Sequence, residues 1–65
     1  MKLRINGEER TLAAKTVADV IDHLQLKPEQ VVVELNKNIV KREEYGKTDV
    51  KDGDTLEIVT LVGGG

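Results

Sequence analysis

Residues 2–24, KLRINGEERTLAAKTVADVIDHL, decide the fold, because they specify two strands, a tight turn and a helix in succession. In KLRIN, the apolar Leu3 and Ile5 alternate with polar residues, which predicts a half-buried strand. Asn6-Gly7 is the strongest short-range hairpin signal, because both residues tolerate a positive φ. The ERTLA that follows predicts the returning strand, with Leu12 as its best core candidate.

A helix follows this hairpin, with Thr16 as its N-cap. The Thr16 hydroxyl can accept a hydrogen bond from the backbone N–H near Asp19, which lies in the first turn, where the helix dipole favours an anion. Apolar residues then recur at i, i+3, i+4 and i+7 and form one stripe that faces a core: Val17, Val20, Ile21 and Leu24. Pro28 cannot continue the helix, so we expect it to end at or before Leu26.

Short strands and turns make up the rest of the chain. VVVEL predicts a strand whose buried face carries Val31, Val33 and Leu35, with Glu34 on the solvated face. The other segments predict, in order, a turn at 36–38, a brief strand at 39–40, a loop or a single helical turn in KREEYGKT, a turn at 51–54 and a last, longest strand at 55–62.

This order of elements predicts an α+β fold, because a single helix must cover one face of a mixed sheet. A hairpin, a helix and then further strands form the β-grasp arrangement of ubiquitin-like proteins, in which the last strand lies centrally beside the first. We expect residues 1–62 to form this single domain. Residues 63–65, three glycines, are expected to form a flexible tail.

Composition excludes several classes of function. The 65 residues include no Cys, Phe or Trp, so a disulfide or a thiolate zinc site is excluded, and we expect no metal site. Ten Lys and Arg against 12 Asp and Glu leave a net charge of -2, which predicts no nucleic-acid partner. There is no apolar run long enough for a membrane span and no signal peptide, so we expect a cytoplasmic protein. The ring of Tyr45, the one aromatic residue, should pack over the end of the core with its hydroxyl in water.

No side chains assemble a catalytic site. His23 points away from the apolar stripe and has no base partner, so a surface role is favoured. The carboxylates Asp19 and Asp22 lie on an open helix without a reason for perturbed pKa values, and we interpret them as solubilising charge. We apply the same interpretation to Glu43-Glu44 and to the Asp52-Gly53-Asp54 turn. The chain is therefore not expected to be an enzyme.

One apolar cluster is predicted to lie on the outside of the sheet. If Leu56 and Ile58 face the helix, Val59 and Leu61 face outward, next to Val32 on the neighbouring strand. Clustered exposed apolar side chains indicate a docking surface for a partner. Scattered surface aliphatics, which are common, are the alternative.

The segments LNKNIVKREEY, DVKDGDTLEIV and the terminal LVGGG closely resemble the ThiS family of small sulfur carriers in thiamine (thiazole) biosynthesis, over nearly the whole chain. The resemblance implies that the carboxylate of Gly65 is the functional group and that Gly63 and Gly64 carry it. An E1-like enzyme (ThiF-like) is expected to adenylate this carboxylate with ATP. Sulfur from a cysteine desulfurase then makes it a thiocarboxylate, and a thiazole synthase (ThiG-like) receives the sulfur.

The glycines suit this role mechanically. Fully extended, three residues reach roughly 10 Å, and without Cβ atoms they fit a narrow active site. A molybdopterin-synthase-type carrier and a ubiquitin-like modifier share the same terminus, and a plain β-grasp interaction module would use none of its chemistry. We expect no bound cofactor, with ATP consumed by the activating partner, and a monomer when the protein is free.

Overall fold

Five strands and one α-helix follow one another in the predicted order in the computed structural model, which describes residues 1–61. The strands are β1 (Lys2–Ile5), β2 (Glu8–Thr11), β3 (Val31–Leu35), β4 (Asn38–Val40) and β5 (Thr55–Thr60). Helix α1 spans Val17–His23, and two single 3₁₀ turns, η1 (Pro28–Gln30) and η2 (Arg42–Glu44), precede β3 and follow β4. The single helical turn expected in KREEYGKT is confirmed as η2, whereas η1 was not predicted from the sequence.

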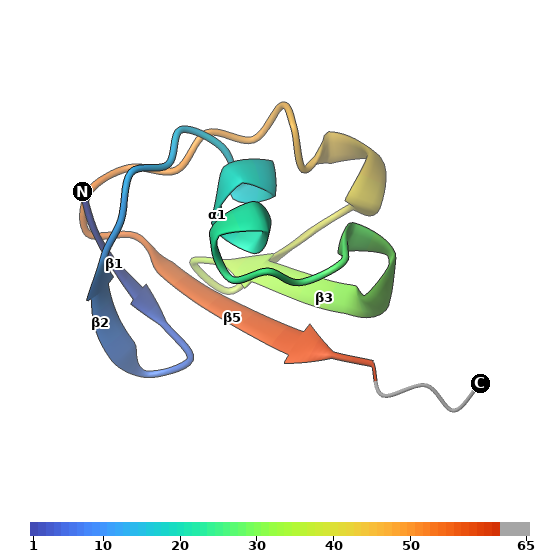
Figure 1. Cartoon of the computed structure of the whole chain (residues 1–65), viewed down its shortest axis with the longest axis horizontal. Helices are drawn as coiled ribbons and strands as arrows, with labels where there is room; N and C mark the ends of the chain where they lie inside the picture. The colour runs from blue at the N-terminus through green and yellow to red at the C-terminus, as the bar shows by residue number, and fades with distance from the viewer. Residues whose placement is uncertain (62–65) are drawn as a thin grey trace.

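The strands form one mixed sheet in the order β2-β1-β5-β3-β4. Strand β5 lies in the centre, parallel to β1 and antiparallel to β3, and the two hairpins flank it. In Figure 1, β5 begins near the N-terminus and crosses the whole molecule. This topology confirms the α+β, ubiquitin-like β-grasp fold.

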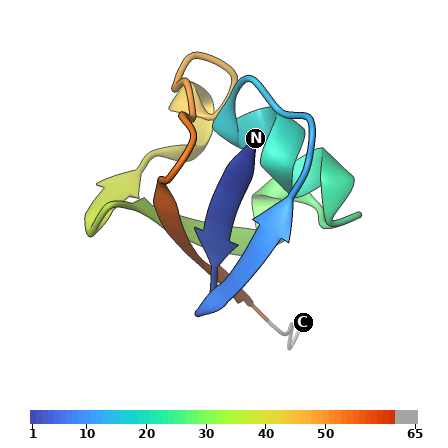
Figure 2. The same cartoon turned by 90° about the vertical axis from the view of Figure 1, so that its left-hand side faces the viewer.

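Helix α1 covers one face of this sheet, as Figure 2 shows from the side. Its stripe is buried as predicted: Val17, Val20 and Ile21 are at most 1% exposed, while Leu24 is half-buried at the C-cap. From the sheet and its connections the core adds Leu3, Ile5, Val31, Val33, Val40, Tyr45, Val50, Leu56 and Ile58. Leu12 lies one residue beyond β2 and only packs against this core.

The first turn of α1 corrects one prediction. Thr16 caps the helix as expected, accepting from the N–H of Asp19 at 3.3 Å. Asp19, however, is not merely a solubilising charge. Its carboxylate accepts from the N–H groups of Lys15 (2.9 Å) and Thr16 (3.1 Å), which completes a capping box. These two hydrogen bonds stabilise the ionised form and lower the pKa of Asp19 below its ordinary value.

Tyr45 corrects a second prediction, because its hydroxyl is not in water. The side chain is only 5% exposed, and its hydroxyl donates to the backbone C=O of Val31 at 3.2 Å. Strand β4 pairs with β3 only from Leu35 back to Val33, so no β4 residue lies opposite Val31. The Tyr45 hydroxyl therefore supplies the hydrogen bond that β4 is too short to make.

Candidate functional site

The outward face of β3 and β5 carries the apolar pair that the sequence predicted. Val32 and Val59 lie directly opposite each other in the register of the two strands. Their neighbours Val31, Val33 and Ile58 are buried, whereas Val32 is 37% exposed and Val59 is 57% exposed. Directly opposed residues have Cβ atoms about 5 Å apart, so the two side chains form one continuous apolar surface.

Leu61 extends this surface past the end of the strand. Strand β5 ends at Thr60, two residues before the predicted limit, so Leu61 is not a strand residue. Its N–H still donates to the C=O of Gln30 at 2.7 Å, which continues the pairing between the two segments. The Leu61 side chain is 53% exposed. Val62 and the predicted tail and carboxylate residues Gly63, Gly64 and Gly65 lie outside the described residues.

Sequence reasoning missed one residue of the same face, Ile39, and it did not predict that Glu57 and Glu34 lie opposite each other. Glu57 lies opposite Glu34 in the β5–β3 register, and Glu34 lies opposite Ile39 on β4. Ile39 is 69% exposed, more than any other large apolar side chain among residues 1–61. The signal was available in the sequence, because Val40 faces the core and the alternation of a strand then turns Ile39 outward.

These residues together form what we call the docking face: Val32, Glu34, Ile39, Glu57, Val59 and Leu61. It is the outer surface of the sheet, away from α1, and it extends from Ile39 on β4 to Leu61 just past the end of β5. Two like charges directly opposite each other destabilise a sheet, and among residues 1–61 neither glutamate forms an ion pair. The face is therefore apolar with a central negative charge.

The other candidate groups are not brought together. His23 is exposed near the end of α1, and Asp22 is exposed on the same helix. Residues 1–61 contain no group of three or more His, Asp or Glu side chains placed to hold a metal ion. Within this same stretch, no helix combines the length and the apolar character required to cross a bilayer.

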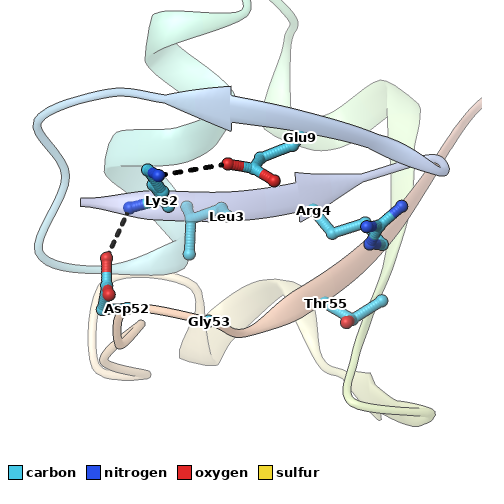
Figure 3. A pocket seen from close by; sticks show the side chains of 7 residues that line it. All are labelled: Lys2, Leu3, Arg4, Glu9, Asp52, Gly53 and Thr55. Carbon is cyan, nitrogen blue, oxygen red and sulfur yellow. Dashed lines mark hydrogen bonds and ion pairs between the residues drawn. The ribbon is translucent and has the colours of Figure 1, made fainter.

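A hollow of about 330 Å³ lies beside β1, at the opposite end of β5 from Leu61 (Figure 3). Its polar groups have partners: Lys2 Nζ lies 3.6 Å from Glu9 Oε2, the backbone N–H of Lys2 donates to Asp52 Oδ1 at 2.6 Å, and Arg4 Nη1 donates to the C=O of Gly7 at 3.1 Å. Both side chains of the ion pair are more than half exposed, so their charges remain hydrated. This hollow holds no arrangement of nucleophile and base.

Comparison with known proteins decides the family. The model of the ThiS family matches residues 3–65. The chain belongs to the ThiS family. It is 37% identical to the sulfur carrier protein ThiS of Bacillus subtilis, over 97% of this chain and 98% of that protein. The crystal structure of the thiamine biosynthesis protein ThiS from Geobacter metallireducens superposes with a TM-score of 0.82 at 38% identity, and each chain is covered completely.

Two further relatives are larger proteins. The chain is 47% identical to part of the thiazole synthase of Paramagnetospirillum magneticum and 38% identical to part of that of Magnetococcus marinus. It is covered completely in both comparisons but spans only 20% of the length of each protein. In these two proteins, a ThiS-like region and a thiazole synthase belong to one polypeptide.

Membership of the ThiS family settles the broad class of this protein. The two ThiS proteins that this chain matches over all or nearly all of their length are a sulfur carrier protein and a thiamine biosynthesis protein, not catalysts. The prediction that the chain is not an enzyme is confirmed by that membership.

Proposed function

We propose that this protein carries sulfur on its C-terminal carboxylate for the formation of thiazole. The observation that supports the proposal is the position of the docking face. Its apolar pair, Val32 and Val59, lies at the end of β5 from which the chain continues through Leu61 to the glycines. A partner that binds this face therefore lies beside Leu61, the point from which the chain continues to its last four residues.

The chemistry follows from the electronic properties of a carboxylate. An α-carboxylate is ionised at neutral pH, and in this form it is a poor electrophile. An E1-like partner activates the carboxylate by binding it beside ATP. A carboxylate oxygen attacks the α-phosphorus of ATP, pyrophosphate is released, and an acyl adenylate is formed. A persulfide sulfur supplied through a cysteine desulfurase then displaces AMP, and a thiol cleaves the S–S bond. The chain keeps one sulfur as a thiocarboxylate.

The absence of cysteine from the sequence is consistent with this route, because no side-chain thiol competes for the sulfur. Thiazole synthase is the proposed acceptor. Its support is the occurrence of a ThiS-like region within the thiazole synthases of two relatives, where the two functions share one chain. In the present protein the docking face would bring the carrier and the synthase together. No cofactor bound by the carrier is required, because the activating partner uses the ATP.

Intact mass tests this proposal. The protein is incubated with an E1-like enzyme of thiamine biosynthesis, ATP, a cysteine desulfurase, cysteine and a thiol reductant. We expect the mass increase of an oxygen-to-sulfur exchange, and none for the chain that lacks Gly65 although it folds. Attachment to a lysine of another protein would indicate a ubiquitin-like modifier instead. No change, in a mixture that converts the Bacillus subtilis ThiS, would refute the carrier function.

The thiazole branch is tested separately from the carrier chemistry. Purified thiocarboxylate is mixed with thiazole synthase or with the large subunit of a molybdopterin synthase, each with its other substrates. We expect loss of sulfur, seen as return to the original mass, with thiazole synthase. Consumption by the molybdopterin enzyme alone would assign the protein to that pathway.

A further inference from the structure

The side chain of Asn6 takes the place of a strand residue beside β5. Strand β1 pairs with β5 only as far as Ile5, opposite Leu56, and the N–H of Asn6 makes the last backbone bond, to Leu56 O at 2.9 Å. The chain then reverses at Asn6-Gly7, where φ is +52° and +84°. Beyond this point the backbone of β1 is no longer available to β5.

The amide of Asn6 continues the pairing by one step. Its Oδ1 accepts from the N–H of Ile58 at 2.7 Å, and its Nδ2 donates to the C=O of Ile58 at 3.0 Å. The side-chain amide therefore supplies one donor and one acceptor, as the backbone N–H and C=O of a residue in a neighbouring strand would. Asn is suited to this position because it also tolerates the left-handed conformation that the turn requires.

We propose that Asn6 is a positioning residue for the activation of the C-terminus. On its other edge, the end of β5 is held by β3 through the Val31–Thr60 register and the bond from Leu61 N–H to Gln30. On the opposite edge of β5, where β1 has turned away, the bonds from Asn6 to Ile58 are, among residues 1–61, the ones nearest the end of the strand. With both edges held, Val59 and Leu61 are presented to a partner in one orientation. This inference rests on the proposed function.

The chain contains a matched control at the other end of β5. Asn36 also has a positive φ, +51°, and its Oδ1 accepts from the N–H of Thr55 at 3.0 Å. Its Nδ2 donates to Asp54 Oδ1 at 3.1 Å. Glycine accepts a positive φ without strain, so Asn6→Gly and Asn36→Gly both keep their turns and both lose an amide beside β5. Asn6 bonds to Ile58, the residue before Val59, whereas Asn36 bonds to Thr55, four residues before Val59.

The test is the exchange of labelled pyrophosphate into ATP by an E1-like enzyme, measured against carrier concentration at a temperature where all variants are folded. For Asn6→Gly we expect the KM for the carrier to rise about five- to thirtyfold, with kcat little changed. Without the Asn6 amide, about one more residue must be ordered when the partner binds, and the entropy lost in ordering it weakens binding by about this factor. Asn36→Gly should change the KM less than about twofold. Hydrogen exchange at the Leu61 amide, which bonds to Gln30 and not to Asn6, should accelerate only in Asn6→Gly.

Equal KM values for the two variants, or an unchanged Leu61 exchange rate in Asn6→Gly, would overturn the inference about Asn6. If Asn6→Gly does not fold, Asn6→Asp replaces it, because it keeps the acceptor but loses the donor, and a rise in KM is again expected. A wild-type protein that supports no exchange, with an enzyme that activates the Bacillus subtilis ThiS, would refute the proposed function itself. The two failures are therefore distinguished by the wild-type measurement.

Discussion

Asp19 links the stability of the helix to pH. The pKa of Asp19 is lowered in the folded state, mainly by the hydrogen bond from Lys15 N–H and next by the one from Thr16 N–H. The ionised carboxylate therefore contributes to folding stability at neutral pH. That contribution is lost as pH falls below the ordinary value of 3.8 and through the lower folded-state pKa. Asp19→Asn should therefore be less stable than wild type at pH 7, and the difference should shrink in acid.

Urea unfolding at a series of pH values measures this difference. Asp22→Asn is the matched control, because Asp22 is exposed on the same helix but outside the capping box. Its substitution should leave the free energy of unfolding almost unchanged. A stability difference for Asp19→Asn that stays constant from neutral pH into acid would show that its ionised carboxylate does not cap the helix.

Tyr45 provides a second prediction at the scale of one residue. Tyr45→Phe removes the hydroxyl and leaves the C=O of Val31 without that donor. Because Tyr45 is buried, we expect a loss of about 1 kcal/mol in the free energy of unfolding, measured by thermal or urea denaturation. The ring remains, so the fold should persist. An unchanged free energy of unfolding would mean that the hydrogen bond from the Tyr45 hydroxyl to Val31 is no stronger than the bonds that the hydroxyl makes to water in the unfolded chain.

At the scale of elements, the pairing of β3 with β5 produces the docking face. Val59→Asp should weaken binding to the E1-like enzyme about tenfold or more, as expected for an apolar residue at the centre of an interface. The loss of folding stability should be about 1 kcal/mol or less, because Val59 is 57% exposed. Titration calorimetry and urea unfolding measure the two effects.

Thr11→Asp is the control for this substitution. Thr11 is also β-branched and exposed, and it lies on β2 at the far edge of the same sheet. Its replacement should cost similar stability without weakening binding. If both variants bind equally well, or if Val59→Asp loses only stability, the docking face is assigned wrongly.

The opposed glutamates on these strands make a separate prediction. Glu57→Gln removes the repulsion between Glu57 and Glu34, so the free energy of unfolding should rise by roughly 0.2–1 kcal/mol. Binding should weaken if a basic partner side chain neutralises the pair, and binding should then depend less on salt. Measurements of Kd at several salt concentrations test this. Tighter binding of Glu57→Gln would show that the charges oppose docking.

The sequence predicted the elements well wherever a local rule determined them. The Asn6-Gly7 hairpin, the Thr16 cap and the outward position of Val59 all follow from turn chemistry and periodicity. Predictions failed where the partner of a group comes from elsewhere in the fold. The hydroxyl of Tyr45 bonds to Val31 and the amide of Asn6 bonds to Ile58, and no spacing in the sequence announces either contact.

The whole molecule also explains why the docking face was predicted only in part. Val59 and Val32 were found because alternation along each strand indicates the face of each side chain. Glu34 and Glu57 were predicted to lie on the solvated face, but their direct opposition depends on the register between β3 and β5, which the sequence does not specify. The terminal glycines were assigned from the resemblance to the ThiS family, since no side chain carries that function.

The central position of β5 has a consequence for how the molecule is made. Residues 1–54 contain two hairpins, β1–β2 and β3–β4, that have no strand pairing with each other until β5 is inserted between them. A ribosome must therefore deliver residues 55–60 before the sheet can close, and the nascent chain exposes two unpaired edges until then. A chain interrupted before that point remains a target for proteases and chaperones. The sheet is therefore completed only when β5, the last strand among residues 1–61, has been synthesised.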